Sequence, residues 1–118
     1  MKILNLDVCC SVSEYNRISQ QIKIVDITDV DKVNDYVVFT LYDCTIEQLA
    51  VLENELTDCS SLINIRLDTA DLLLIETFVD DHDLYVDIDY DPDDWIVINN
   101  HYTDSNMTFD VVKALLSL

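Results

Sequence analysis

The chain has 118 residues, half of them hydrophobic, and a formal net charge of −18 from 24 acidic and 6 basic residues. The length fits one domain of roughly 100–150 residues, and the apolar content excludes a disordered acidic tail. Solubility alone does not explain the charge, because a small domain needs a net charge of only roughly 2–8 in magnitude. We therefore expect a single compact acidic domain over residues 1–118.

The first third of the chain predicts alternating strands and helices. Alternating apolar residues over 2–9 indicate a strand. Ser11 and Glu14 have the spacing of a capping box, which predicts a helix that runs to about residue 21. Residues 22–27 indicate a second strand, and residues 28–35 a turn or a single helical turn.

The middle of the chain repeats this alternation. Residues 36–42, "YVVFTLY", are β-branched and aromatic and predict a central strand. Thr45 and Gln48 form a second capping-box pattern, which opens a helix with apolar residues at helical spacing as far as Leu56. Alternation over residues 62–67 predicts the return of the chain to the sheet.

The C-terminal part contains one segment whose sequence fits two kinds of secondary structure. The apolar run over residues 70–79 fits a strand or a buried helical turn. We favour a strand, because residues 79–83 then form a polar turn into a strand over 84–90. A strand over 95–102 and an amphipathic helix from Thr108 complete the chain. The expected fold is α+β: a mostly antiparallel β-sheet, with a three-strand meander in this half and two to three short helices packed on one face. We find no linker and no internal repeat.

Composition excludes several classes of site. The chain has no glycine, so glycine-rich phosphate loops, dinucleotide-binding fingerprints and nucleophile elbows are absent, and turns must use Asp, Asn, Ser and the one proline. No apolar run approaches the roughly 20 residues of a membrane span, and residues 1–10 are too short and charged for a secretory signal. We expect a cytoplasmic protein without membrane contact. The cysteines form no C-x-x-C pair and are expected as reduced, buried thiols: Cys9, Cys10, Cys44 and Cys59.

The acidic residues are concentrated in the second half. Residues 68–110 hold 13 acids and no Lys or Arg, and six aspartates lie within residues 83–95. A strand over 84–90 turns Tyr85, Asp87 and Asp89 to the face opposite the apolar side chains. Alternate carboxylates then lie roughly 6.6 Å apart, close to two phosphate steps of about 3.4 Å each. We expect a hairpin that presents a ladder of negative charge to a partner, through Asp80, Asp81, Asp83, Tyr85, Asp87, Asp89, Asp91, Asp93 and Asp94.

The same aspartates also partly match a metal-binding loop. Asp87, Asp89 and Asp91 match the first ligands of a calcium loop, but Pro92 replaces its glycine and Ile98 its bidentate glutamate. We therefore predict no metal site.

The two histidines, His82 and His101, have no marked partner for nucleophilic or acid–base chemistry, and His82 is interpreted as a turn residue. We expect no enzymatic activity and no cofactor. Trp95 fits two roles equally, an exposed binding anchor beside the acids or a core residue.

A field this negative repels nucleic acid and anionic membranes and attracts the basic surfaces of nucleic-acid-binding proteins. In charge, size and lack of catalytic motifs, the chain resembles the small acidic anti-CRISPR and anti-restriction proteins of phages and mobile elements that mimic DNA. The resemblance is one of composition over the whole chain, without a family motif.

The resemblance implies a non-enzymatic inhibitor, in the cytoplasm of a bacterial host, of a basic nucleic-acid-binding protein such as a CRISPR effector or a restriction enzyme, without direct nucleic acid binding. The alternative is an immunity protein that neutralises a basic nuclease toxin. A third class is a structural or assembly protein whose charge keeps it soluble. An exposed edge strand also leaves a homodimer open.

Overall fold

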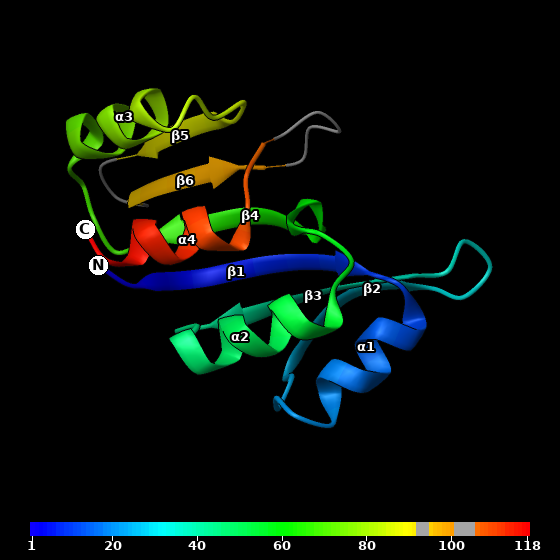
Figure 1. The fold of residues 1–118 in the computed structure, drawn as a ribbon. Coiled ribbons are helices and arrows are strands. Elements are labelled where there is room, and N and C mark those ends of the chain that lie inside the picture. Colours follow the sequence, from blue (N-terminus) through cyan, green and yellow to red (C-terminus); the bar gives the residue numbers. More distant parts are fainter. Residues whose placement is uncertain (92–94, 101–105) are drawn as a thin grey trace.

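The structure, a computed structural model, describes residues 1–91, 95–100 and 106–118. Six antiparallel strands form one sheet in the order β2-β3-β1-β4-β6-β5, and the helices lie on one side of it (Figure 1). The predicted α+β class is confirmed, and the described residues form four α-helices in place of the expected two to three. The three-strand meander is wrong, because the described part of the second half forms only a two-strand hairpin beside β4.

The first half of the chain forms a β-α-β-β-α unit. Both predicted capping boxes are present, at Ser11 with Glu14 and at Thr45 with Gln48, so local sequence starts both helices of this unit. The elements are β1 (Ile3–Cys10), α1 (Val12–Ser19), β2 (Asp26–Asp31), β3 (Tyr36–Tyr42) and α2 (Ile46–Glu55). A single 3-10 turn, η1 (Cys59–Ser61), leads into the second half.

The second half forms the same series of elements. They are β4 (Leu62–Leu67), α3 (Leu72–Asp81), β5 (Asp87–Asp91), β6 (Trp95–Asn99) and α4 (Phe109–Leu116). The strand predicted over 62–67 and the C-terminal helix that follows Thr108 are confirmed.

The predicted strand over residues 70–79 is wrong, because most of this segment is helix α3. Asp71 caps the helix, with its side chain accepting a hydrogen bond from the Leu74 amide at 3.1 Å. Ile75, Phe78 and Val79 are buried at helical spacing. The adjacent Leu73 and Leu74 are exposed, and they hide this periodicity in the sequence.

The second strand of the first half is shifted along the chain. The predicted strand over 22–27 is wrong, since β2 covers Asp26–Asp31 and its hairpin with β3 closes over residues 32–35. Polar residues fill β2 because it is the edge of the sheet and packs against few apolar groups. β5 begins at Asp87, three residues later than predicted, and β6 ends at Asn99.

The two halves repeat one topology. In each, the third strand lies between the first and the second, and the first strands, β1 and β4, pair antiparallel at the centre of the sheet. Elements β1 to β4 thereby have the connectivity of the ferredoxin-like split β-α-β motif, and α3 links β4 to β5 across β6 in the same manner. The internal repeat that the sequence analysis did not find relates the halves by a pseudo-two-fold axis between β1 and β4.

The repeat is also visible in the sequences of the two hairpins when they are aligned by their strand registers. "DITDVD" of β2 corresponds to "DIDYD" of β5, and "YVVFT" at the start of β3 corresponds to "WIVIN" of β6. The one extra residue of β2 is absorbed by a register shift between Ile27 and Asp29. The two edge strands therefore place aspartates at equivalent positions.

The core lies between the sheet and the helices. On β1, β3, β4 and β6, the side chains that face the helices are almost wholly buried, as for Phe39, Ile65 and Ile98. These residues belong to one hydrophobic cluster that includes side chains of all four α-helices. The opposite face of the sheet carries no helix of the described part of the chain, and its described side chains are exposed or half-buried, except for the buried Thr40.

Candidate functional site: the open face of the sheet

A row of polar side chains crosses the whole sheet on the face away from the helices. Each member pairs directly with the next across neighbouring strands, and directly paired residues point to the same face. In spatial order, the row is Asp26, Thr40, Asp7, Asn64, Asn99 and Asp87. We call this side of the sheet the open face. Its other described positions are Asn5, Cys9, Asp29, Asp31, Tyr36, Val38, Tyr42, Arg66, Asp89, Trp95 and Val97.

The centre of the open face is a hydrogen-bonded carboxylate. Asp7 on β1 accepts a hydrogen bond from Thr40 Oγ1 on β3 at 2.6 Å and one from Asn64 Nδ2 on β4 at 3.1 Å. Hydrogen bonds from both neighbouring strands thus fix the orientation of the Asp7 carboxylate.

At the β2 edge, tyrosines of β3 hold the aspartates. The Tyr36 hydroxyl donates to Asp29 at 3.0 Å, and the Tyr42 hydroxyl donates to Asp26. These hydrogen bonds to carboxylates raise the pKa of both tyrosines. The third aspartate, Asp31, accepts hydrogen bonds from the turn residues that follow it. The bonds from Asn34 are the largest cause of its lowered pKa.

At the β5 edge, Asp87 and Asp89 are exposed on the same face. Asn99 Nδ2 on β6 donates to Asp89 Oδ2 at 2.6 Å. Asp91 occupies the register position opposite Trp95. Both edges of the sheet therefore carry an aspartate at three equivalent positions.

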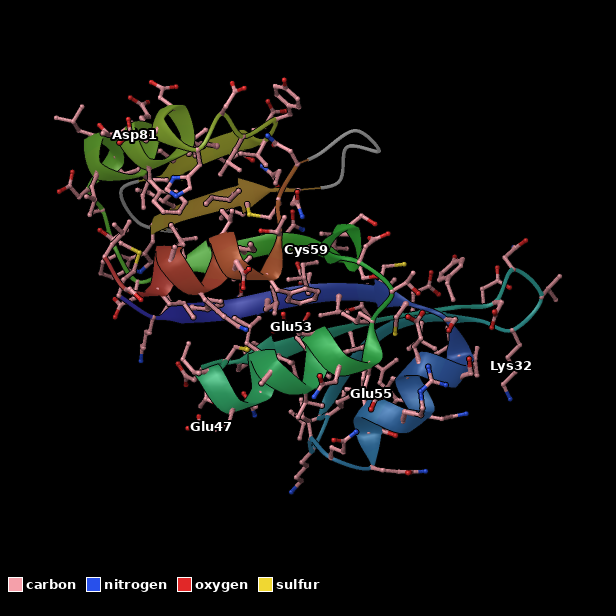
Figure 2. All side chains as sticks on the ribbon, in the orientation of Figure 1. Lys32, Glu47, Glu53, Glu55, Cys59 and Asp81 are labelled. Atoms are coloured by element: carbon pink, nitrogen blue, oxygen red, sulfur yellow. The ribbon has the colours of Figure 1, made fainter. Side chains whose placement is uncertain are left out.

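The structure does not bring the predicted binding residues together on one surface. Asp87 and Asp89 lie on the open face, as strand geometry predicts, and Asp91 ends the same strand. Asp80 and Asp81 end helix α3 in the helix layer, where Figure 2 shows Asp81. Four further predicted residues lie outside the strand or outside the described residues: Asp83 and Tyr85 in the connection before β5, and Asp93 and Asp94, which the described ranges leave out.

Asp83 closes helix α3 in a conformation that usually requires glycine. Its φ is 51°, its amide donates to the Asp80 carbonyl at 3.1 Å, and the Leu84 amide donates to the Val79 carbonyl at 3.0 Å. These two bonds form a Schellman motif, and the side chains of Leu84 and Val79 are both buried. Since the chain has no glycine, Asp83 fills the left-handed position.

The acids at the end of α3 oppose the helix dipole. Asp80, Asp81 and Asp83 lie at its C-terminal end, where negative charge is unfavourable, with typical effects of about 0.3–1 kcal/mol for each charge. Helix stability therefore does not explain the acids at this end.

The acids of the first half were not among the predicted binding residues. Asp7, Asp26 and Asp29 lie outside the run over 68–110, yet cross-strand pairing brings them onto the same face as Asp87 and Asp89. The signal that would have found them is the repeated pattern of the two hairpins, "DITDVD" and "DIDYD".

The positive charges are placed mainly away from the open face. Arg17 pairs with Glu55 at 2.8 Å and Lys113 pairs with Glu53, both between helices. Glu53 and Glu55 on α2 are labelled in Figure 2. Arg66 is the one Lys or Arg among the described residues of the open face. The face is therefore strongly negative.

An aromatic side chain accompanies each acidic edge. Tyr36 begins β3 and Trp95 begins β6, at equivalent positions of the two hairpins. Trp95 is 40% exposed, so it is not a core residue, and its φ of 68° is rare for a bulky side chain. Of its two predicted roles, exposure favours the anchor.

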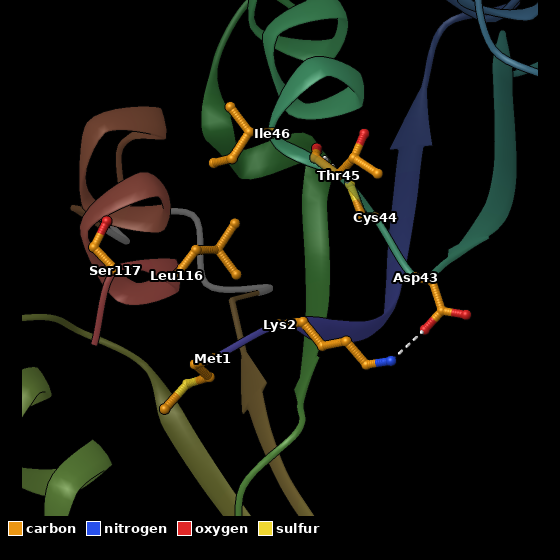
Figure 3. A pocket seen from close by; sticks show the side chains of 8 residues that line it. All are labelled: Met1, Lys2, Asp43, Cys44, Thr45, Ile46, Leu116 and Ser117. Carbon is orange, nitrogen blue, oxygen red and sulfur yellow. Dashed lines mark hydrogen bonds and ion pairs between the residues drawn. The ribbon is translucent and has the colours of Figure 1, made fainter.

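Two pockets of the described residues lie off the open face. One of about 360 Å³ is lined by residues near the chain start, including Met1, Thr45 and Leu116, and the Lys2–Asp43 ion pair of 3.3 Å borders it (Figure 3). Another of about 630 Å³ lies between α3 and α4, where the His82 ring stacks on Phe78. The second has a largely apolar lining. Neither contains a described grouping of nucleophile, base and acid.

Other expected features can be placed. All four cysteines are free; Cys10, Cys44 and Cys59 are buried, as expected, whereas Cys9 is half-buried. Within residues 1–91, 95–100 and 106–118, no group of three or more His, Cys, Asp or Glu is arranged to hold a metal ion. Asp87, Asp89 and Asp91 form a strand, whereas a calcium loop must wrap around its ion. Among the described helices, none has the length and apolar character needed to cross a bilayer.

Comparison with protein-family models, curated proteins and solved structures finds no match to this chain. The ferredoxin-like connectivity does not supply a function, because one topology serves many unrelated activities. The open face is therefore the feature from which a function can be inferred.

Proposed function

We propose that the protein is a non-enzymatic inhibitor that covers the basic nucleic-acid-binding surface of another protein with the open face of its sheet. The observation that carries the proposal is that both edge strands place aspartates on one helix-free face. Carboxylates there would pair with the Lys and Arg side chains that otherwise hold phosphate.

Preorganisation supports this role over a merely solvated surface. Asp7, Asp26, Asp29 and Asp89 each accept a hydrogen bond from a side chain of a neighbouring strand. Side chains that are ordered before binding lose less conformational entropy in a complex. A fixed array of charge also favours one geometry of basic partner over others.

The shape of the face supports a macromolecular partner. Small-molecule sites are usually concave and enclose their ligand, whereas the open face is one side of a sheet, and the two pockets described above lie elsewhere. We place the target among basic nucleic-acid enzymes of a bacterial host, such as CRISPR effectors and restriction enzymes, whose channels are positively charged. The host cytoplasm is the compartment in which the two would meet.

The test uses two variants that lose the same number of charges. The open-face variant carries Asp26→Asn, Asp29→Asn, Asp87→Asn and Asp89→Asn, which keep the hydrogen-bond acceptors of the four side chains. The helix-layer control changes four exposed acids of α2 and α3, through Glu47→Gln, Glu76→Gln, Asp80→Asn and Asp81→Asn. Circular dichroism and thermal melting verify that both fold.

Each immobilised protein is then incubated with nuclease-treated bacterial lysate that contains CRISPR effectors and restriction enzymes, and duplex DNA is added as competitor. We expect the natural protein and the helix-layer control to retain one basic nucleic-acid enzyme that DNA releases, and the open-face variant to lose it. Loss in the control alone would move the site to the helix layer. Retention by all three proteins would refute the acidic surface as the site. Capture of a nuclease toxin that DNA does not release would instead identify an immunity protein.

A further inference from the structure

The two acidic edges of the open face are copies of each other, which a single continuous binding site does not require. The pseudo-two-fold axis between β1 and β4 relates Asp26 to Asp87, Thr40 to Asn99, and Asp7 to Asn64. The register shift in β2 preserves this relationship, because it returns Asp29 to the same face as Asp26.

The repeat extends beyond the charges to the aromatic and apolar side chains of the face. Tyr36 and Trp95 are equivalent, and so are the half-buried Val38 and Val97. Each edge therefore offers aspartates, an aromatic ring and a valine in the same arrangement. A basic segment that fits one edge would find similar groups at the other.

From these relationships we infer that the open face carries two equivalent sites for basic segments, one at the β2 edge and one at the β5 edge. It fits a partner that presents the same basic segment twice about a two-fold axis, so that one copy of this protein spans a partner dimer. This inference rests on the proposed function, since it assumes that the acids bind a basic protein.

The spacing of the two sites follows from the sheet. Five inter-strand steps separate β2 from β5, and at about 4.8 Å for each step the edges lie about 24 Å apart. Two basic segments joined across this distance would bind together more tightly than either alone, because the second binding event becomes intramolecular.

The centre of the face separates the two sites chemically. At the axis, Asp7 is matched by the neutral Asn64, and Arg66 is the one basic side chain among the described positions. Among the described positions of the open face, the aspartates other than Asp7 belong to the edge strands. The charge is thus divided into two groups, with less negative charge between them.

The experiment uses defined peptides as probes. One probe is hexalysine. The other joins two hexalysine blocks through a flexible Gly/Ser linker of about 20 residues, whose r.m.s. length of roughly 25 Å matches the distance between the edges. Isothermal titration at low salt measures the number of sites and the affinity for each probe.

The natural protein is compared with three variants that each lose two charges. These are Asp26→Asn with Asp29→Asn, Asp87→Asn with Asp89→Asn, and a two-charge helix-layer control, Glu47→Gln with Glu76→Gln. We expect two equivalent hexalysine sites in the natural protein and in the control, and one site in each edge variant. The linked probe should bind the natural protein one to one and at least ten-fold more tightly than hexalysine, and each edge variant should lose most of this gain.

Failure of this inference is distinguishable from failure of the proposed function. If both edge variants weaken hexalysine binding but the natural protein shows one site and no gain for the linked probe, the open face binds basic segments without two-fold equivalence. If only one edge variant has an effect, the second site is refuted. If hexalysine does not bind, or all three variants behave alike, the open face itself is refuted.

Discussion

Asp7 and Asn64 lie directly opposite each other on β1 and β4, and Asn64 Nδ2 donates to Asp7 Oδ2 at 3.1 Å. The pseudo-two-fold axis makes these two positions equivalent, so a strict repeat would place two carboxylates side by side. Opposed like charges destabilise an antiparallel pair, whereas the amide converts the contact into a hydrogen bond. The symmetry is broken where it would be most costly.

Asn64→Asp is therefore expected to destabilise the protein at pH 7 by about 1–2 kcal/mol. Repulsion raises the folded pKa of the introduced carboxyl above its unfolded value of about 3.9. The variant therefore keeps its stability below that unfolded value and loses it as the pH rises through the raised pKa. Urea unfolding from pH 3 to pH 7 measures this effect. Asn64→Ala is the control, with a loss of about 1 kcal/mol that depends little on pH. A loss in Asn64→Asp that does not depend on pH would contradict the explanation.

Glu14 links helix α1 to the end of α2. Burial by itself raises its pKa, but hydrogen bonds from Ser11 and Thr57 outweigh burial and lower it. A lowered folded pKa means that the stabilisation is present above the unfolded value of about 4.3 and is lost as the pH falls through the folded pKa. Glu14→Gln should therefore be about 1 kcal/mol less stable at pH 7 but nearly equal to the natural protein at pH 3. Thermal melts at several pH values test this expectation. Glu47→Gln, at an exposed position, is the control. If the stability of both variants depended equally on pH, the stabilising role of Glu14 would be contradicted.

Asp83 occupies the left-handed position of the α3 Schellman motif, next to a helix end that already carries two acids. Asp83→Gly should raise the stability by about 0.5–1 kcal/mol, since glycine adopts this conformation without steric cost and the change removes an unfavourable charge. The expected rise in Tm is about 2–5 °C for a domain of this size. Asp80→Gly, which removes the same charge inside the helix, should instead lower Tm. A fall in Tm for Asp83→Gly would show that its side chain stabilises the turn.

The four thiols should differ in their reactivity toward Ellman's reagent. Burial raises the pKa of Cys44 to about 11, and burial with nearby acidic residues raises the pKa of Cys10 and Cys59 to about 12. Cys9 is half-buried and its pKa is also raised, by burial and then by Asp29. At pH 8 the folded protein should expose one slowly reacting thiol to Ellman's reagent, and all four should react in urea. Cys9→Ser should remove the slow reaction. Rapid reaction of several thiols in the folded protein would contradict the buried placement.

The elements predicted correctly from sequence are those with local signals. The capping boxes at Ser11 and Thr45 start α1 and α2, and the β-branched run over 36–42 forms β3. The strand predicted in place of helix α3 is wrong because Leu73 and Leu74 are apolar but exposed, which obscures the helical period of the buried residues. Which leucines are buried depends on tertiary packing, and the local sequence does not predict it.

The candidate site was only half predictable for a related reason. The alternation of Asp87 and Asp89 in one strand is a local pattern, and strand geometry places both on one face. That Asp26 and Asp29 share this face depends on pairing across six strands and on a bulge in β2. The dense run of acids in the sequence indicates the β5 edge alone, whereas the fold places aspartates at both the β2 edge and the β5 edge.

The two ends of the chain meet in the folded protein, where the Met1 amino group lies 3.4 Å from the Leu118 carbonyl (Figure 1). A short linker could therefore join them without distorting β1 or α4. Opening the chain between the halves, near residue 57, would then place the second unit before the first. Because each unit contributes its own three adjacent strands, the rearranged chain should build the same sheet. In this architecture the two units can follow each other in either order along the chain, provided that β1 and β4 still pair.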